Sequence, residues 1–227
     1  MIARLAFVTI FVLSAAVAQA DQRFYFGVDI GDGALNLDYD GFNTVGIFSN
    51  LDEGREGAST TTRLVFGSED AYVFGNLRIS PEAEITYSRG INTFSNSFPG
   101  PPGPFAFFYR GEMESLSVGL MVWADLADNG VIELQGGIGA GTSLVDFQTT
   151  DFVVGADDIQ SVNYGTIALR ANFELSDRVD LSFGVRHTEY GSANFGLVSN
   201  VGNVPAGNII VDRSSTEISL GLRYFFN

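Results

Sequence analysis

The sequence predicts an all-β protein, an eight-stranded antiparallel up-and-down β-barrel that crosses a membrane. Three observations lead to this prediction. Eight segments alternate apolar and polar residues, the connections between them alternate between long and short, and the first twenty residues form an export signal. A period of two gives a strand one apolar and one polar face. Short turns on one edge and long loops on the other are typical of barrels inserted in a membrane.

The N-terminal segment has the three parts of a signal peptide. Arg4 supplies the positive charge, Leu5–Val17 is almost wholly apolar, and Ala18-Gln19-Ala20 is a small-x-small cleavage site. The apolar run is shorter than the roughly 20 residues of a spanning helix. We therefore expect a signal peptide over residues 1–20 and one barrel domain over residues 21–227. An uncleaved N-terminal anchor is the alternative.

Composition excludes several functions. The chain of 227 residues has no cysteine, one histidine and a net charge of −15, and all twelve basic residues are arginine. The charge argues against nucleic acid as a partner, because neutralising phosphates needs a basic surface. The missing cysteines exclude disulfides and a thiol nucleophile, and one histidine excludes a histidine-rich metal site. We expect no cofactor, no metal and no catalytic residue.

Eight segments show the alternation that is typical of a strand with one apolar face. In the first, Phe26 and Val28 alternate with Gly27 and Asp29, and the later segments repeat this pattern with other residues. In the fourth, for example, leucine and valine alternate with serine and glycine. The eight predicted strands are Phe24–Leu35, a stretch between Thr60 and Ile79, Glu82–Gly90, Met113–Ala124, Val131–Ser143, Val162–Leu175, Val179–Tyr190 and Ser215–Asn227.

The second strand is the least defined. Thr60–Ile79 is longer than the roughly 9–11 residues that one crossing needs. Either the strand extends beyond the bilayer with a bulge at Ser68-Glu69-Asp70, or this acidic triplet is a turn. A turn would add a strand, and an even number would then require another. A ten-stranded barrel is therefore the alternative fold.

The connections between the predicted strands form two groups, short turns and long loops. Short turns are predicted around Ser80-Pro81, at residues 125–130 and at residues 176–178, and long loops at residues 36–58, 91–112, 144–160 and 191–214. In the second short turn, Asp128-Asn129-Gly130 is typical of a hairpin with glycine at positive φ. One long loop contains the proline- and phenylalanine-rich segment 98–109, whose aromatic residues could bind a partner or pack on the barrel rim.

The two faces of the strands have different environments. We expect the apolar sets to face lipid, with Tyr87 and Tyr224 at the interfaces, and the polar sets to face inward with Trp123. An eight-stranded barrel is just wide enough for side chains to fill, and arginine binds carboxylates bidentately. The sequence therefore predicts a lumen plugged by Asp29, Glu84, Glu133, Arg170, Glu174, Arg186, Glu217 and Arg223. A narrow water-filled pore lined by the same charges is the alternative.

The last strand, Ser215–Asn227, alternates to the chain end and closes on aromatic residues. It resembles the C-terminal strand of bacterial outer-membrane β-barrels, in which a terminal aromatic is read by the barrel assembly machinery. On this resemblance Tyr224 and Phe226 form the assembly signal, with Asn227 as one additional residue. The mature chain resembles the small outer-membrane β-barrel family, such as the OmpA transmembrane domain and porin-like proteins, without the OmpA periplasmic domain.

The resemblance implies a location and a role. It implies a monomer in the cell outer membrane with both termini in the periplasm, in contact with outer-membrane lipids, lipopolysaccharide and the assembly machinery. It also implies a structural or surface-interaction role without catalysis. A small pore for ions or solutes is the first alternative. A lipid A-modifying enzyme is the second, but the deacylases of that group have His-x-Ser where this chain has His187-Thr188-Glu189.

Overall fold

The computed structural model describes residues 23–43, 47–49, 57–74, 77–98, 105–150 and 154–226. The predicted signal peptide and Asn227 lie outside these residues. No helix that could span a bilayer occurs in the described part of the chain. The strands are β1 (Arg23–Asn43), β2 (Ile47–Ser49), β3 (Gly57–Glu69), β4 (Tyr72–Phe74), β5 (Leu77–Phe98), β6 (Phe105–Asp128), β7 (Ile132–Thr150), β8 (Val154–Ser176), β9 (Val179–Ser199) and β10 (Pro205–Phe225).

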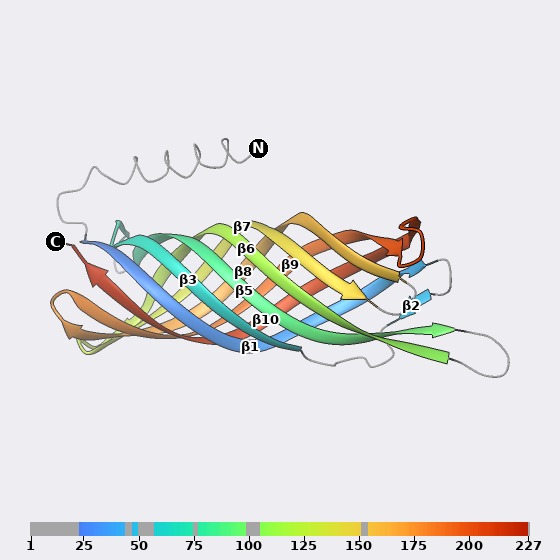
Figure 1. Cartoon of the computed structure of the whole chain (residues 1–227). Coiled ribbons are helices and arrows are strands. Elements are labelled where there is room, and N and C mark those ends of the chain that lie inside the picture. Colours follow the sequence, from blue (N-terminus) through green and yellow to red (C-terminus); the bar gives the residue numbers. More distant parts are fainter. Residues whose placement is uncertain are drawn as a thin grey trace.

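Eight long antiparallel strands form a closed, elongated barrel (Figure 1). Each long strand pairs with the next one, and β1 pairs with β10 from Tyr25↔Phe225 to Asn43↔Gly207, which closes the sheet. The two short strands do not cross the barrel: β2 lies between the outer ends of β1 and β5, and β4 pairs only with the start of β5. The prediction of eight crossing strands is confirmed, and the ten-stranded alternative is wrong.

The turn after the second crossing strand lies earlier than predicted. β3 ends at Glu69, Asp70 follows with a φ of 51°, and β5 begins at Leu77. Ser80-Pro81 is therefore not a turn, and Pro81 pairs with Val122 inside β5. The ladder between β3 and β5 ends at Gly67↔Glu82. Proline is tolerated there because its missing amide proton breaks no pairing with β3.

The predicted long loops are mostly strand. β1 continues to Asn43, β9 to Ser199, and β10 begins at Pro205. The segments predicted as loops 36–58, 91–112, 144–160 and 191–214 therefore mainly extend the hairpins. Seven of the eight crossing strands have 19 to 24 described residues, about twice the length of one crossing, and β3 has 13. One half of the barrel thus projects beyond the length that a bilayer covers, at the end opposite the short turns (Figure 1).

The two halves of the barrel have opposite polarity. Near the short turns, apolar side chains such as Phe26, Val28 and Leu220 face outward and are exposed, as predicted. The outward apolar run in β10 ends at Ile218, which fits a crossing of roughly 9–11 residues. In the other half, Asp38 and Asp40 face outward while Leu37 is buried inside. This inversion indicates lipid around the first half and water around the second.

Three layers of side chains fill the lumen in order. The charged layer, nearest the turns, contains Tyr25, Asp29, Arg63, Glu82, Glu84, Trp123, Gln135, Arg170, Arg186, Glu217 and Arg223. The hydroxyl layer follows with Ser59, Thr61, Thr86, Ser88, Ser115, Ser117, Ser143, Thr166, Thr188 and Ser215. The apolar layer contains Leu35, Leu37, Tyr39, Met113, Val145, Phe147, Val154, Ala156, Val162, Ala193, Phe195, Leu197, Ala206, Ile209 and Val211.

Candidate functional site: the charged lumen

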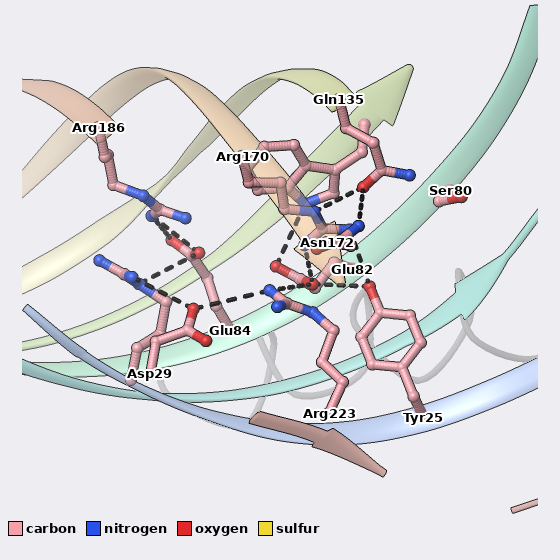
Figure 2. Close-up of polar contacts among 12 residues, drawn as sticks. Tyr25, Asp29, Ser80, Glu82, Glu84, Gln135, Arg170, Asn172, Arg186 and Arg223 are labelled. Atoms are coloured by element: carbon pink, nitrogen blue, oxygen red, sulfur yellow. Dashed lines mark hydrogen bonds and ion pairs between the residues drawn. The ribbon is translucent and has the colours of Figure 1, made fainter. Parts of the chain in front are cut away.

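Glu82 is the centre of one half of the charged layer, and Figure 2 shows Tyr25, Arg170 and Arg223 pointing toward it. Its Oε2 accepts hydrogen bonds from Tyr25 Oη at 2.6 Å and from Arg170 Nη1 at 2.8 Å. Its Oε1 accepts one from Trp123 Nε1 at 3.2 Å, and Arg223 Nη2 lies 3.6 Å from Oε2. The guanidinium of Arg170 also stacks on the Trp123 ring, 3.9 Å from its centroid. Side chains from β1, β6, β8 and β10 therefore surround one buried carboxylate of β5.

Glu84 is the centre of the other half. Arg186 Nη1 donates to both carboxylate oxygens at 2.9 Å, and Tyr164 Oη donates to Oε1 at 3.1 Å. Arg63 Nε lies 3.7 Å from Glu84 Oε2, and Arg63 Nη2 donates to Glu217. Tyr164 reaches this position because Gly119 has no side chain: a Cβ at Gly119 would lie 2.0 Å from the hydroxyl.

Asp29 joins the two halves. Its Oδ2 lies 3.5 Å from Arg63 Nη1 and 3.7 Å from Arg223 Nη2. Facing it on β10, Gly221 leaves the space that its carboxylate occupies, because a Cβ there would lie 1.9 Å from Asp29 Oδ1. The connected network contains four arginines and four carboxylates, and all eight are buried: Asp29, Arg63, Glu82, Glu84, Arg170, Arg186, Glu217 and Arg223. Its formal charges balance.

The structure places most of the predicted lumen residues in this network. Six of the eight belong to it: Asp29, Glu84, Arg170, Arg186, Glu217 and Arg223. The other two lie at the turn end. Glu133 is half-buried and accepts a hydrogen bond from Asn172 Nδ2 at 3.0 Å. Glu174 is exposed and is not part of the network.

Three important lumen residues are absent from the predicted set of network residues. Arg63 lies in the stretch whose strand limits could not be fixed from sequence. Glu82 is recognisable as an inward residue from alternation, but nothing in the sequence marks it as the central carboxylate. Arg213 falls in a predicted loop, whereas the structure buries it inside β10. The local signal for Arg213 is the β-branched run Ile209-Ile210-Val211 just before it, which is typical of a strand.

A second group of charges lies at the turn end. Arg78 Nε is 2.6 Å from Asp125 Oδ2, and its Nη2 donates to Asp128 Oδ2 at 2.8 Å. The hairpin turn there has the predicted form, with Gly130 at a φ of 80°. Its backbone N–H donates to Asp128 Oδ1 at 2.8 Å, and Asn129 Oδ1 accepts hydrogen bonds from the backbone amides of Val131 and Ile132. Together these contacts fix the turn between β6 and β7.

These contacts predict the direction in which the pKa of the Asp128 carboxyl is shifted. The backbone hydrogen bond from Gly130 and the hydrogen bond from Arg78 lower the pKa of Asp128 below its ordinary value of 3.8. The charged form therefore contributes stability above the ordinary pKa, and this contribution is lost as the pH falls through the lowered value. We expect Arg78→Gln to raise the pKa of Asp128, measured by carboxyl NMR titration. Arg89→Gln, which removes an arginine on the outer surface, is the control. An unchanged pKa in Arg78→Gln would contradict the assignment.

The outer surface carries the other residues singled out from sequence. Tyr224 and Phe226 face outward and make an edge-on ring contact with centroids 5.7 Å apart. Tyr87 also faces outward, while Trp123 lies inside, as predicted. His187 faces outward: its Nδ1 is 2.8 Å from Thr216 Oγ1 and its Nε2 is 2.9 Å from Glu189 Oε1. The side chains of segment 98–109 lie outside the described residues.

The ionised groups of the charged layer are paired with one another. Its carboxylates are held by arginine or tyrosine, and aromatic rings cover two of the guanidinium groups. In the described part of the chain, acidic and histidine side chains form no group of three that could hold a metal ion. The closed sheet, the outward apolar belt and the charged lumen together define a transmembrane β-barrel.

Comparison with known proteins gives the same class. No protein-family model and no curated protein match the chain. Among solved structures, OprG from Pseudomonas aeruginosa is similar with a TM-score of 0.56 and 12% identity, over 90% of this chain and 96% of that one. A major outer membrane protein from Thermus thermophilus has a TM-score of 0.51 and 14% identity, over 89% of this chain and 99% of that one. The outer membrane protease OmpT from Escherichia coli has a TM-score of 0.51 and 12% identity, over 93% of this chain and 100% of that one. The fold is that of outer-membrane β-barrel proteins.

Proposed function

We propose that this chain is an integral outer-membrane barrel with a structural or surface-interaction role, that it is not an enzyme, and that its lumen is closed. The observation that carries the proposal is the continuous filling of the lumen by three layers of side chains. Two cavities in the described lumen have volumes of only about 10 and 20 Å³. Each holds about one water molecule, which favours a plug over a pore.

The proposed position in the membrane follows from the outer surface. The apolar belt around the turn half matches one crossing, and we propose that the termini and short turns lie on its periplasmic side. The projecting half then lies outside the cell, where carboxylates such as Asp38, Asp40 and Glu189 face water and lipopolysaccharide. We propose that the protein is a monomer, contacts outer-membrane lipids, and uses Tyr224 and Phe226 as its signal to the assembly machinery.

The natural absence of cysteine allows a direct test of this orientation. We expect Val201→Cys, at the tip between β9 and β10, to react with a membrane-impermeant maleimide in intact cells. Val131→Cys, in the turn between β6 and β7, should react only after the outer membrane is permeabilised. Val201 and Val131 are both highly exposed, at 81% and 69%, so accessibility in the folded protein does not distinguish them. Equal labelling of both in intact cells, or the reverse pattern, would contradict the proposed orientation.

An enzyme activity is the alternative that the His187 contacts raise. A hydroxyl and a carboxylate flank the ring, and one protein of similar fold is named a protease. His187 and its partners lie on the outer wall, and none of them contributes to the lumen network. On the proposed function, cells that express His187→Ala have the same lipid A as cells that express the native protein.

A further inference from the structure

Arg213 is a buried cation whose partners are all uncharged. β10 places it where the hydroxyl layer meets the apolar layer, and its side chain is 6% exposed. Its Nη1 donates to Ser115 Oγ at 3.0 Å and its Nη2 to Ser88 Oγ at 2.8 Å. Its Cζ lies 4.2 Å from the centroid of the Tyr190 ring. No carboxylate of the described residues forms an ion pair with it. Buried charges in proteins are normally paired.

The neighbouring charges do not compensate Arg213. The charged layer already pairs four arginines with four carboxylates, and the further buried carboxylate, Asp180, lies opposite Arg223 near the turns and away from Arg213. Three guanidinium groups and two carboxylates line the cavity next to Arg213: those of Arg63, Arg186, Arg213, Glu84 and Glu217. Arg186 and Tyr164 hold Glu84, and Arg63 holds Glu217. One positive charge is therefore left over beside this cavity.

The cavity also contains polar atoms whose hydrogen-bonding capacity is unused. Arg213 Nε and Thr86 Oγ1 are buried and have no hydrogen-bond partner, and both residues line the cavity. Arg63 Nε, a third lining atom, has no hydrogen bond either and only the 3.7 Å contact with Glu84. Two of the three are N–H groups, which can only donate, and the third is a hydroxyl, which can donate. Leaving such groups buried without partners destabilises the fold, so an acceptor in the cavity would stabilise it.

The size of the cavity limits what that acceptor can be. The cavity has a volume of about 10 Å³, which is room for about one water-sized particle. Phosphate, carboxylates and sugars are too large. A water molecule fits and accepts hydrogen bonds, but it is neutral and leaves the charge of Arg213 uncompensated. A monatomic anion satisfies both requirements.

We propose that this cavity binds one monatomic anion of the halide class, with chloride as the biological occupant. Arg213 and Arg63 supply N–H donors and charge, and Thr86 supplies a hydroxyl donor. The low dielectric of the lumen strengthens the attraction. The anion is a structural ion: it neutralises the last buried charge at the boundary between the hydroxyl layer and the apolar layer.

The first test replaces chloride by bromide. The protein is refolded and crystallised in bromide without chloride, and anomalous diffraction is recorded at the bromine edge. We expect one strong anomalous peak inside the barrel between Arg213 and Thr86. Bromide peaks on the outer surface only, or lumen density without anomalous signal, would show that the cavity holds water and would overturn the proposal.

The second test measures halide-dependent stability. We expect the urea midpoint of the native protein to rise with chloride concentration relative to gluconate at equal ionic strength. Arg213→Gln should remove this difference, whereas Arg89→Gln, on the exposed outer surface, should keep it. If Arg213→Gln does not fold, Thr86→Val tests the same cavity with little change in shape, and it should shift the chloride response to higher concentration. A native midpoint that is the same in both salts would overturn the proposal.

Discussion

Glu82→Ala is expected to destabilise the barrel more than any other single substitution in the charged layer. The change removes the carboxylate that Tyr25, Trp123 and Arg170 contact and leaves Arg170 with no ion-pair partner. Breaking a buried ion pair by removing one partner typically costs about 3–5 kcal/mol, because the remaining charge stays buried and uncompensated. We expect a loss of that size in the free energy of unfolding, measured by guanidinium titration of protein refolded into lipid vesicles.

Glu114→Ala is the matched control. Glu114 is also a glutamate paired with an arginine, but it faces outward, and its partner Arg89 is half exposed. Exposed pairs of this kind contribute about 0–1 kcal/mol. If both variants lose the same stability, burial of the ion pairs does not determine their contribution, and the description of the charged layer is wrong.

Phe147→Ala is expected to have the second large effect, in the apolar layer. Phe147 is fully buried, its ring lies 5.0 Å from that of Phe195 and 6.3 Å from that of Tyr39. Truncating a buried phenylalanine costs about 3–5 kcal/mol through lost burial and the cavity that is left. We expect a loss of this size in the same unfolding measurement.

The comparison variant for Phe147 is its chain neighbour. Gln148 is exposed on the opposite face of β7, and surface substitutions usually change stability by about 0.5 kcal/mol or less. Gln148→Ala should therefore leave the unfolding midpoint nearly unchanged. A Phe147→Ala variant as stable as Gln148→Ala would mean that the projecting half of the barrel has no packed interior in solution.

The fold could largely be predicted from sequence because the lipid-facing pattern is local. Every second residue in Ile218–Phe226 is apolar, and most other crossing segments show the same pattern, so counting gives eight strands, with only the stretch Thr60–Ile79 leaving ten open. The projecting half was missed for a physical reason. Leu35, Leu37 and Tyr39 alternate with Asn36, Asp38 and Asp40, which is also a strand pattern, but one with polar residues outward, as in a soluble barrel. Its acidic residues and glycines are equally typical of loops.

The sequence predicts that charged side chains face the lumen, but it does not predict which of them pair with one another. Alternation assigns Asp29, Arg170 and Arg223 to the lumen without any structure. Their pairing depends on contacts between strands far apart in sequence, such as Arg170 with Glu82, 88 residues away. Arg63 follows three threonines, which are tolerated on either face of a strand, so the local pattern could not define its orientation.

The central claim is that side chains close the lumen, and single-channel conductance in a planar bilayer tests it most directly. The native protein, refolded and inserted, should add no discrete current steps, while a general porin in the same bilayer gives steps as the positive control. Insertion is verified by the slower gel migration after boiling. Reproducible steps from the inserted native protein would contradict the account, because the charged, hydroxyl and apolar layers would then not block the lumen.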